Sequence, residues 1–158
     1  MARKNIAMNE TEILDFLASG RTLQVATHGP DGFPHLAPMW YIVEEGKVVF
    51  RTFTKSQKLV NLTRDPRLTV LVERGETYAD LQGVMIKGRA RLVTDRSAVL
   101  RIYGRITARY VIGGEAIEEL TGDALEAAYG RYADKNTAVI VEPEHVISWD
   151  HTKLGGVY

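Results

Sequence analysis

The alternation of apolar and polar residues predicts a series of short strands joined by turns and helices. Apolar and polar positions alternate with period 2 in several segments, which is typical of half-buried strands. The predicted strands are 22–27, 34–43, 47–53, 68–73 and 79–93, with a final pair at 137–141 and 145–149 hinged at Pro143. The sequence His28-Gly29-Pro30-Asp31-Gly32 supplies turn chemistry, so the first two strands are expected to form a hairpin.

Helical spacing of apolar residues appears between these strands. Asn9 and Glu12 form the pattern of a capping box ahead of an amphipathic helix that Gly20 ends. A short helix after residue 54 is expected to end by Asp65, because a proline follows it. Asp95 opens a longer helix, whose apolar stripe is expected to consist of Val99, Ile102, Tyr103, Ile106 and Tyr110. The pair Gly113-Gly114 interrupts that helix, and a further helix is expected at 123–132.

The order of the elements indicates the fold class. The strands follow one another in hairpin order without strand-helix-strand alternation, so we expect a mainly β protein with helices, built as a small antiparallel barrel. The chain of 158 residues predicts a single domain over 1–158. A Rossmann fold is not expected, because the glycine pair lies between helices and not after a strand.

Composition excludes several classes of function. Twenty basic and twenty acidic residues give a formal net charge of 0, so no global field draws the chain to nucleic acid or membranes. Without cysteine there is no disulfide, thiolate metal site or cysteine nucleophile. The four histidines lack metal-ligand spacing, so no metal site is expected. With no signal-peptide pattern and no apolar run of about 20 residues, we expect a cytoplasmic location.

The most informative stretch follows the predicted strand 47–53. The segment contains three hydroxyl residues and two lysines at the point where a helix is expected to begin. They are Thr52, Thr54, Lys55, Ser56 and Lys58. Lysine is disfavoured at a helix N-terminus, because unpaired N–H groups and the macrodipole already make that end positive. Lys55 and Lys58 are three residues apart and are expected to share one helix face. A phosphate or polycarboxylate would compensate their charges, so the stretch predicts an anion site. The alternative is that Thr54 simply caps a solvated surface helix.

A second candidate segment surrounds Pro38. His35, Ala37 and Met39 alternate on one predicted strand, and a proline within a strand indicates an edge or a bulge. Backbone groups of an edge strand can face a ligand, although an edge strand without a ligand is an equally good interpretation. No serine-histidine-acid set or carboxylate pair stands out, so no catalytic side chain is assigned and a bound cofactor would carry any chemistry.

The candidate segments resemble a known family. The run Pro34-His35-Leu36-Ala37-Pro38-Met39-Trp40-Tyr41, then Phe50-Arg51-Thr52, Lys55-Ser56-Gln57-Lys58 and residues 61–67, resembles the pyridoxamine 5′-phosphate oxidase-like split-barrel superfamily. More narrowly, it is similar to the branch that uses the deazaflavin coenzyme F420. The resemblance extends from the opening helix to Trp149. It implies an FMN-binding split barrel of the six-stranded antiparallel Greek-key type, and a homodimer with two cofactor sites in the subunit interface.

The resemblance also implies roles for individual residues. Thr52, Lys55 and Lys58 would bind the cofactor phosphate or acidic tail, with Arg51, Ser56 and Gln57 nearby. His35, Ala37, Pro38 and Met39 would lie along the ring system, mainly through backbone contacts. Trp149 and Lys153 would border the cofactor from the other subunit. Core packing is the ordinary alternative for a tryptophan such as Trp149.

The resemblance predicts an oxidoreductase but argues against vitamin B6 oxidation. True pyridoxamine phosphate oxidases are expected to end near an Arg-Leu-x-Pro element, whereas this chain ends Lys153-Leu154-Gly155-Gly156-Val157-Tyr158. We therefore expect an F420-dependent oxidoreductase that transfers a hydride between F420 and an unsaturated or carbonyl-type small molecule. An FMN-binding oxidoreductase of the same fold, and a non-catalytic flavin, haem or tetrapyrrole-binding module, stay open as alternatives.

Overall fold

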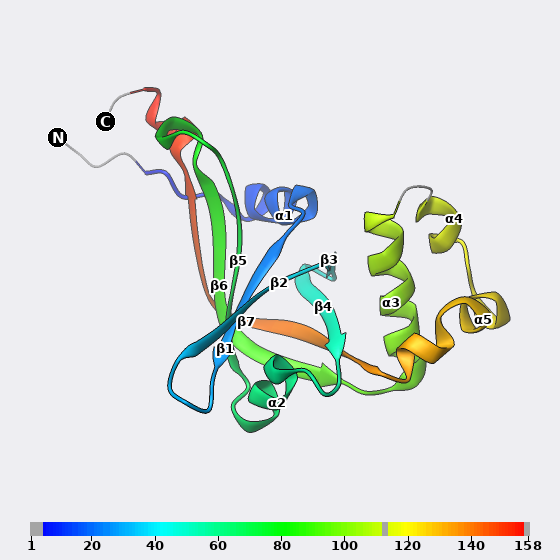
Figure 1. The fold of residues 1–158 in the computed structure, drawn as a ribbon. Helices are drawn as coiled ribbons and strands as arrows, with labels where there is room; N and C mark the ends of the chain where they lie inside the picture. The colour runs from blue at the N-terminus through cyan, green and yellow to red at the C-terminus, as the bar shows by residue number, and fades with distance from the viewer. Residues whose placement is uncertain (1–4, 112–113, 157–158) are drawn as a thin grey trace.

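The computed structural model describes residues 5–111 and 114–156, and within them the strands form one curled sheet (Figure 1). The strand order is β2-β1-β5-β6-β7-β4-β3, and every neighbouring pair is antiparallel. The strands are β1 Leu23–His28, β2 Pro34–Met39, β3 Tyr41–Glu44, β4 Lys47–Phe53, β5 Arg67–Arg74, β6 Gln82–Val93 and β7 Asn136–Asp150.

The helices begin where the caps predict. Asn9 and Glu12 form the capping box of the first helix, and the Asp95 side chain caps the third, so both predictions are confirmed. The helices are α1 Glu10–Ser19, α2 Gln57–Arg64, α3 Arg96–Tyr110, α4 Gly114–Glu118 and α5 Gly122–Ala133, with 3₁₀ turns η1 Tyr78–Asp80 and η2 His151–Leu154. Of the glycine pair expected to interrupt the third helix, Gly114 begins α4, whereas Gly113 lies outside the described residues.

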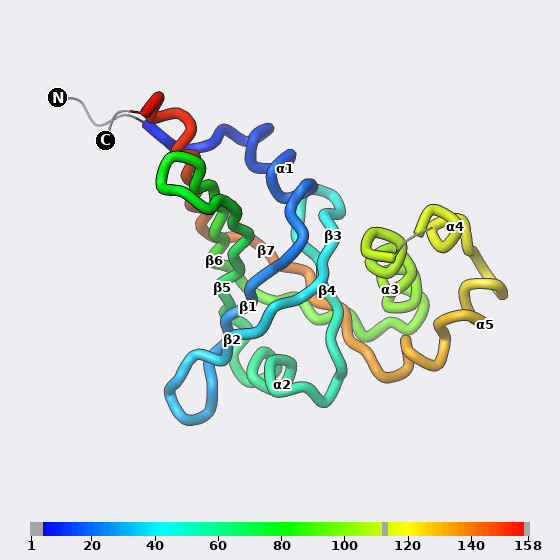
Figure 2. Tube along the Cα trace, turned by 45° about the horizontal axis from the view of Figure 1, so that its top comes forward, coloured from blue at the N-terminus to red at the C-terminus, as the bar shows by residue number. Residues whose placement is uncertain are grey.

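The two edges of the sheet meet at Trp40. Strands β2 and β3 lie at opposite edges of the strand order, yet only Trp40 separates them in sequence. Successive Cα atoms are about 3.8 Å apart, so the ends of the two edge strands cannot be more than about 7.6 Å apart. The sheet must therefore curl until its edges approach each other, as the trace in Figure 2 shows.

The sheet has seven strands, and the expectation of six is corrected. The segment 34–43, predicted as one strand, divides at Trp40, and its two halves pair with β1 and β4 respectively. The predicted hairpin of the first two strands is confirmed by the pairing of β1 with β2. The residues from Leu36 to Val43 are apolar without interruption, so the sequence pattern does not reveal the division.

The predicted final strand pair is a single strand, β7, which contains a β-bulge. Lys87 pairs with His145 and Gly88 pairs with Pro143, so Glu144 is the extra residue. A bulge accommodates a proline, which cannot donate a ladder hydrogen bond. A Cβ atom on Gly88 would lie 2.2 Å from the Glu142 carbonyl oxygen, so glycine permits the close approach of the two strands here.

The buried residues form two clusters on opposite faces of β4. Val48 and Phe50 belong to the cluster inside the curled sheet, which α1 and α2 also contact. Val49, between them, packs on the other face with α3 and α5. Neighbouring residues of β4 therefore point into different environments, as the pleat of a strand requires.

Candidate functional site

The junction between β4 and α2 places hydroxyl groups and one lysine together. The N-cap of α2 is Ser56, whose Oγ accepts a hydrogen bond from the Leu59 N–H at 3.4 Å. Thr54 does not cap the helix, because its hydroxyl is hydrogen-bonded to that of Thr137 at 2.9 Å. Lys58 lies in the first turn, but Lys55 precedes the cap, so the expectation that both lysines share one helix face is wrong.

Lys58 points back to the end of β4. Its Nζ donates to Thr52 Oγ1 at 3.3 Å, and Thr52 Oγ1 lies 3.0 Å from Ser56 Oγ. Thr52 is buried and Lys58 is half-buried. Burial lowers the pKa of Lys58, because the ammonium has lost part of its hydration. Within residues 5–111 and 114–156, neither Lys58 nor the exposed Lys55 contacts a carboxylate.

Buried hydrogen bonds fix α2 against the sheet. Asn61 is fully buried, and its amide donates to Thr27 Oγ1 on β1 at 3.0 Å. Gln57 donates to Asn61 Oδ1 at 2.8 Å. These bonds hold the first turn of α2 in place beside Thr52. The side-chain amide of Gln57 therefore already donates a hydrogen bond within the helix. Its contact with a cofactor stays a prediction.

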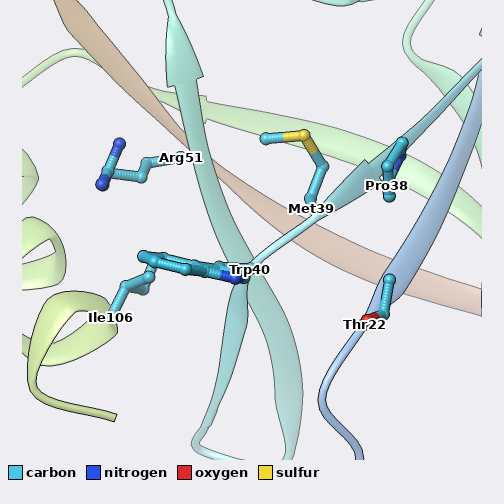
Figure 3. A pocket seen from close by; sticks show the side chains of 6 residues that line it. All are labelled: Thr22, Pro38, Met39, Trp40, Arg51 and Ile106. Carbon is cyan, nitrogen blue, oxygen red and sulfur yellow. The ribbon is translucent and has the colours of Figure 1, made fainter. Parts of the chain in front are cut away.

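Arg51 lies on the opposite face of β4 from Thr52. It borders a cavity of about 380 Å³, a size within the range of ligand sites. The lining side chains are shown in Figure 3 and are Thr22, Pro38, Met39, Trp40, Arg51 and Ile106. The structure thus brings Arg51 together with Pro38 and Met39, while the hydroxyl and lysine groups lie on the other side of the strand.

The guanidinium of Arg51 is held without a carboxylate. Its carbon lies 3.6 Å from the centre of the Tyr103 ring, which is a close cation-π contact. Nη1 reaches Asn136 Oδ1 only at 3.4 Å, and the buried Nε has no acceptor among the described residues. Burial lowers the pKa of Arg51, and Tyr103 partly opposes that shift.

The predicted edge strand around Pro38 is confirmed as β2. His35, Ala37 and Met39 are half-buried and share one face, whereas Pro38 is exposed on the other. The Nδ1 atom of His35 is buried and lacks a hydrogen-bond partner in the described part of the chain. As the sheet's edge, β2 pairs only with β1, so backbone groups on its free side are open to a ligand.

Trp149 and Lys153 lie far from the lysine junction of their own chain. Thr52 pairs with Thr137 near the start of β7, whereas Trp149 is near its end, at the opposite end of the sheet (Figure 1). The Lys153 ammonium donates to the Ala7 carbonyl and to Glu12, at 2.8 and 2.7 Å. A cofactor contact from either residue would have to reach the site of a second subunit, and it stays a prediction.

Sequence reasoning assigned no role to several residues of the cavity. Trp40 stood in the family-like run without a role, and Ile106 was placed only on the apolar stripe of its helix. Tyr103 was on the same stripe. A helical stripe shows that one face is covered but not which strand covers it, so the contact of α3 with Arg51 left no signal in the sequence.

A metal site and a membrane-spanning helix are both absent from the residues that the structure describes. No group of three or more histidine, aspartate or glutamate side chains comes together as a metal would require. In the same residues, no helix is both long enough and apolar enough to cross a bilayer.

The curled antiparallel sheet with its helices is consistent with a split barrel, and comparison with known families agrees with this fold. The model of the family described as pyridoxamine 5′-phosphate oxidase matches residues 10–150, so the chain belongs to that family. The description of that family names an oxidase, so the family includes oxidoreductases. A comparison with curated proteins gives no match.

Solved structures provide further relatives. The conserved hypothetical protein Rv2991 from Mycobacterium tuberculosis is 40% identical, with a TM-score of 0.86 over 100% of this chain and 94% of that chain. An F420 reductase is 20% identical, with a TM-score of 0.61 over 84% and 93% of the two chains. HutZ, the heme storage protein from Vibrio cholerae, is 16% identical, with a TM-score of 0.62 over 88% and 94%. The last two likenesses concern the fold alone.

Proposed function

We propose that the chain is an F420-dependent oxidoreductase. The observation that carries this proposal is the half-buried Lys58, which lies beside the hydroxyls of Thr52 and Ser56 and has no carboxylate partner in the described residues. A cation that has lost hydration without gaining a counter-charge favours binding of an anion. When bound, the reduced deazaflavin supplies a hydride, and the acceptor takes up that hydride and one proton.

The groups at the β4-α2 junction fit a phosphate. Lys58 supplies a positive charge, the hydroxyls of Thr52 and Ser56 supply short-range donors, and Lys55 stands exposed beside them for a longer acidic tail. Each charge-assisted hydrogen bond contributes about 1.5–3 kcal/mol. These residues bind and position the cofactor, and the backbone of Ala37, Pro38 and Met39 supports its ring from the edge strand.

A homodimer would complete this site. Large apolar side chains are exposed on the β1-β2 hairpin and β2, where Phe33 is 75% and Leu36 65% exposed. Val146 and Ile147 on β7 are exposed as well. Large apolar residues that are exposed to solvent favour a protein interface. We propose that a second copy covers them, and that Trp149 and Lys153 reach the cofactor across this interface.

Two other cofactors suit parts of the same arrangement. FMN ends in a phosphate that the Lys58 junction would bind equally well, so an FMN-dependent oxidoreductase is the second candidate. A non-catalytic module for flavin, haem or another tetrapyrrole is the third, and it would use the apolar walls of the cavity without any turnover.

Titration of the purified protein with F420, FMN and haem separates these candidates. We expect saturable, micromolar or tighter binding of F420, weaker binding of FMN and haem, and oxidation of reduced F420 when an unsaturated acceptor is added. Preferred binding of FMN or haem would overturn the cofactor assignment. Tight F420 binding without turnover on any acceptor would favour the binding module.

A further inference from the structure

Within the described residues, Arg51 contacts no carboxylate and no backbone carbonyl, and unlike Arg74 and Arg131, which share this feature but are exposed, it is half-buried. Arg109, by contrast, donates to the backbone carbonyls of Tyr41, Ala18 and Gly20. The arginines that contact carboxylates are Arg67, Arg89, Arg91, Arg96, Arg101 and Arg105. In the described residues, Arg51 instead has a buried Nε without an acceptor and one long bond to an amide. A half-buried guanidinium with unused donors is a site for an anion.

The position of this guanidinium is fixed before any ligand binds. The guanidinium carbon lies 3.6 Å from the centre of the Tyr103 ring. Asn136, which accepts the hydrogen bond from Arg51, in turn donates to the Tyr132 carbonyl at 2.8 Å and is anchored by that bond. An arginine that is already oriented loses little side-chain freedom when it binds. Its planar fork matches the two oxygens of a carboxylate.

The walls of the adjoining cavity are flat and mainly apolar. The Trp40 indole stacks on the Tyr110 ring, with centres 4.7 Å apart and planes within 9°. Met39 and Ile106 line the same cavity of about 380 Å³ (Figure 3). A rigid aromatic wall and aliphatic neighbours favour a planar, conjugated ligand.

We infer that the acceptor bound in this cavity is a flat, conjugated organic acid, with its carboxylate against Arg51 and its ring or double bonds along Trp40. This inference rests on the proposed function, because it names the substrate class of the same protein. Arg51 and Thr52 face opposite sides of β4, so the acceptor's carboxylate and the cofactor's phosphate have separate cations. Arg51 is therefore assigned to the acceptor, whereas family resemblance groups it with the cofactor residues.

The test uses the full chain with 2-naphthoate as probe and neutral 2-naphthamide as its matched control. Calorimetric titration gives the affinities, with F420 absent and at saturation. The chain has two tryptophans, so Trp149→Phe leaves Trp40 as the single indole, and its N–H signal in NMR spectra reports on this cavity. We expect naphthoate to bind about 10- to 100-fold more tightly than naphthamide and to shift the Trp40 signal.

Variants separate charge from packing. Arg51→Gln is expected to reduce naphthoate affinity to that of naphthamide, and Arg51→Lys to restore part of it, while Arg131→Gln on exposed α5 leaves it unchanged. Equal binding of the acid and the amide, or unchanged binding after Arg51→Gln in a variant that melts like wild type, would overturn the inference.

F420 distinguishes this inference from the proposed function. Lys58→Ala should weaken F420 and leave naphthoate affinity unchanged. If naphthoate binds as expected but F420 does not bind, the proposed function fails while the acid site stands. If F420 binds and naphthoate does not, the acid site fails alone. If F420 displaces naphthoate and Arg51→Gln weakens both equally, Arg51 holds the coenzyme's own carboxylates and the acceptor assignment is wrong.

Discussion

The ammonium of Lys58 donates a hydrogen bond to the hydroxyl of Thr52 at 3.3 Å, across the junction between a strand and a helix. This contact brings a cation into a partly buried position where no carboxylate of the described chain meets it. A hydroxyl does not neutralise charge, so the ammonium keeps a desolvation cost that an anionic ligand would offset.

The first prediction concerns pH. Burial lowers the pKa of Lys58 below its ordinary 10.5, so between the two values the unfolded chain binds more protons than the folded chain. Stability of the free protein therefore gains from this group as pH rises through that window. Affinity for F420 should fall over the same window, because the ammonium is lost.

F420 titrations from neutral pH to pH 10.5 measure this effect. In Lys58→Arg the guanidinium stays charged, so its affinity should change little with pH. A decline in that variant as steep as in wild type would assign the pH dependence to another group.

The second prediction concerns Asn61. Asn61→Ala removes the donor to the buried Thr27 hydroxyl and the acceptor of the exposed Gln57 amide, so the Thr27 hydroxyl loses this partner inside the protein. We expect a loss of about 1–3 kcal/mol in the free energy of unfolding, measured by urea denaturation, together with weaker F420 binding because α2 is no longer fixed. Thr63→Ala, on the exposed side of the same helix, is the control. Equal stability of the two variants would contradict this account of how α2 is anchored.

The third prediction concerns Gly83 and Trp149. A Cβ atom on Gly83 would lie 2.2 Å from Cζ2 of the Trp149 ring, so the indole occupies the space that a side chain at 83 would need. Gly83→Ala should destabilise the protein by about 1–3 kcal/mol through overpacking. Trp149→Leu should relieve part of that cost in the double variant, as a double-mutant cycle by denaturation will show. Additive effects would mean that the two residues do not compete for this space.

Elements that depend on nearby residues could be predicted from the sequence. The capping box of Asn9 with Glu12 and the cap at Asp95 involve groups three residues apart, so the pattern contains all the information needed. The turn chemistry of 28–32 likewise predicted the hairpin of β1 with β2. The grouping of Thr52, Ser56 and Lys58 was predictable for the same reason, because the strand-to-helix junction is continuous in the chain.

Features that depend on distant contacts could not be predicted in this way. The division at Trp40 occurs where the sheet curls until its edges meet, and the residues on both sides of it are apolar, so no local signal marks it. Pro143 indicated a hinge, but pairing with Gly88 makes it part of a bulge within one strand. The Arg51 cavity needs α3 against β4, and a helical stripe does not identify the strand that it covers.

The central claim is that the lysines after β4 bind an acidic cofactor, and F420 affinity of the Lys55→Ala, Lys58→Ala double variant tests it most directly. Lys87→Ala, an exposed lysine on β6, is the matched control. We predict wild-type affinity in the control and a loss of at least about 100-fold in the double variant, since each charge-assisted contact contributes about 1.5–3 kcal/mol. Binding of F420 by the double variant as tightly as by wild type would contradict the account.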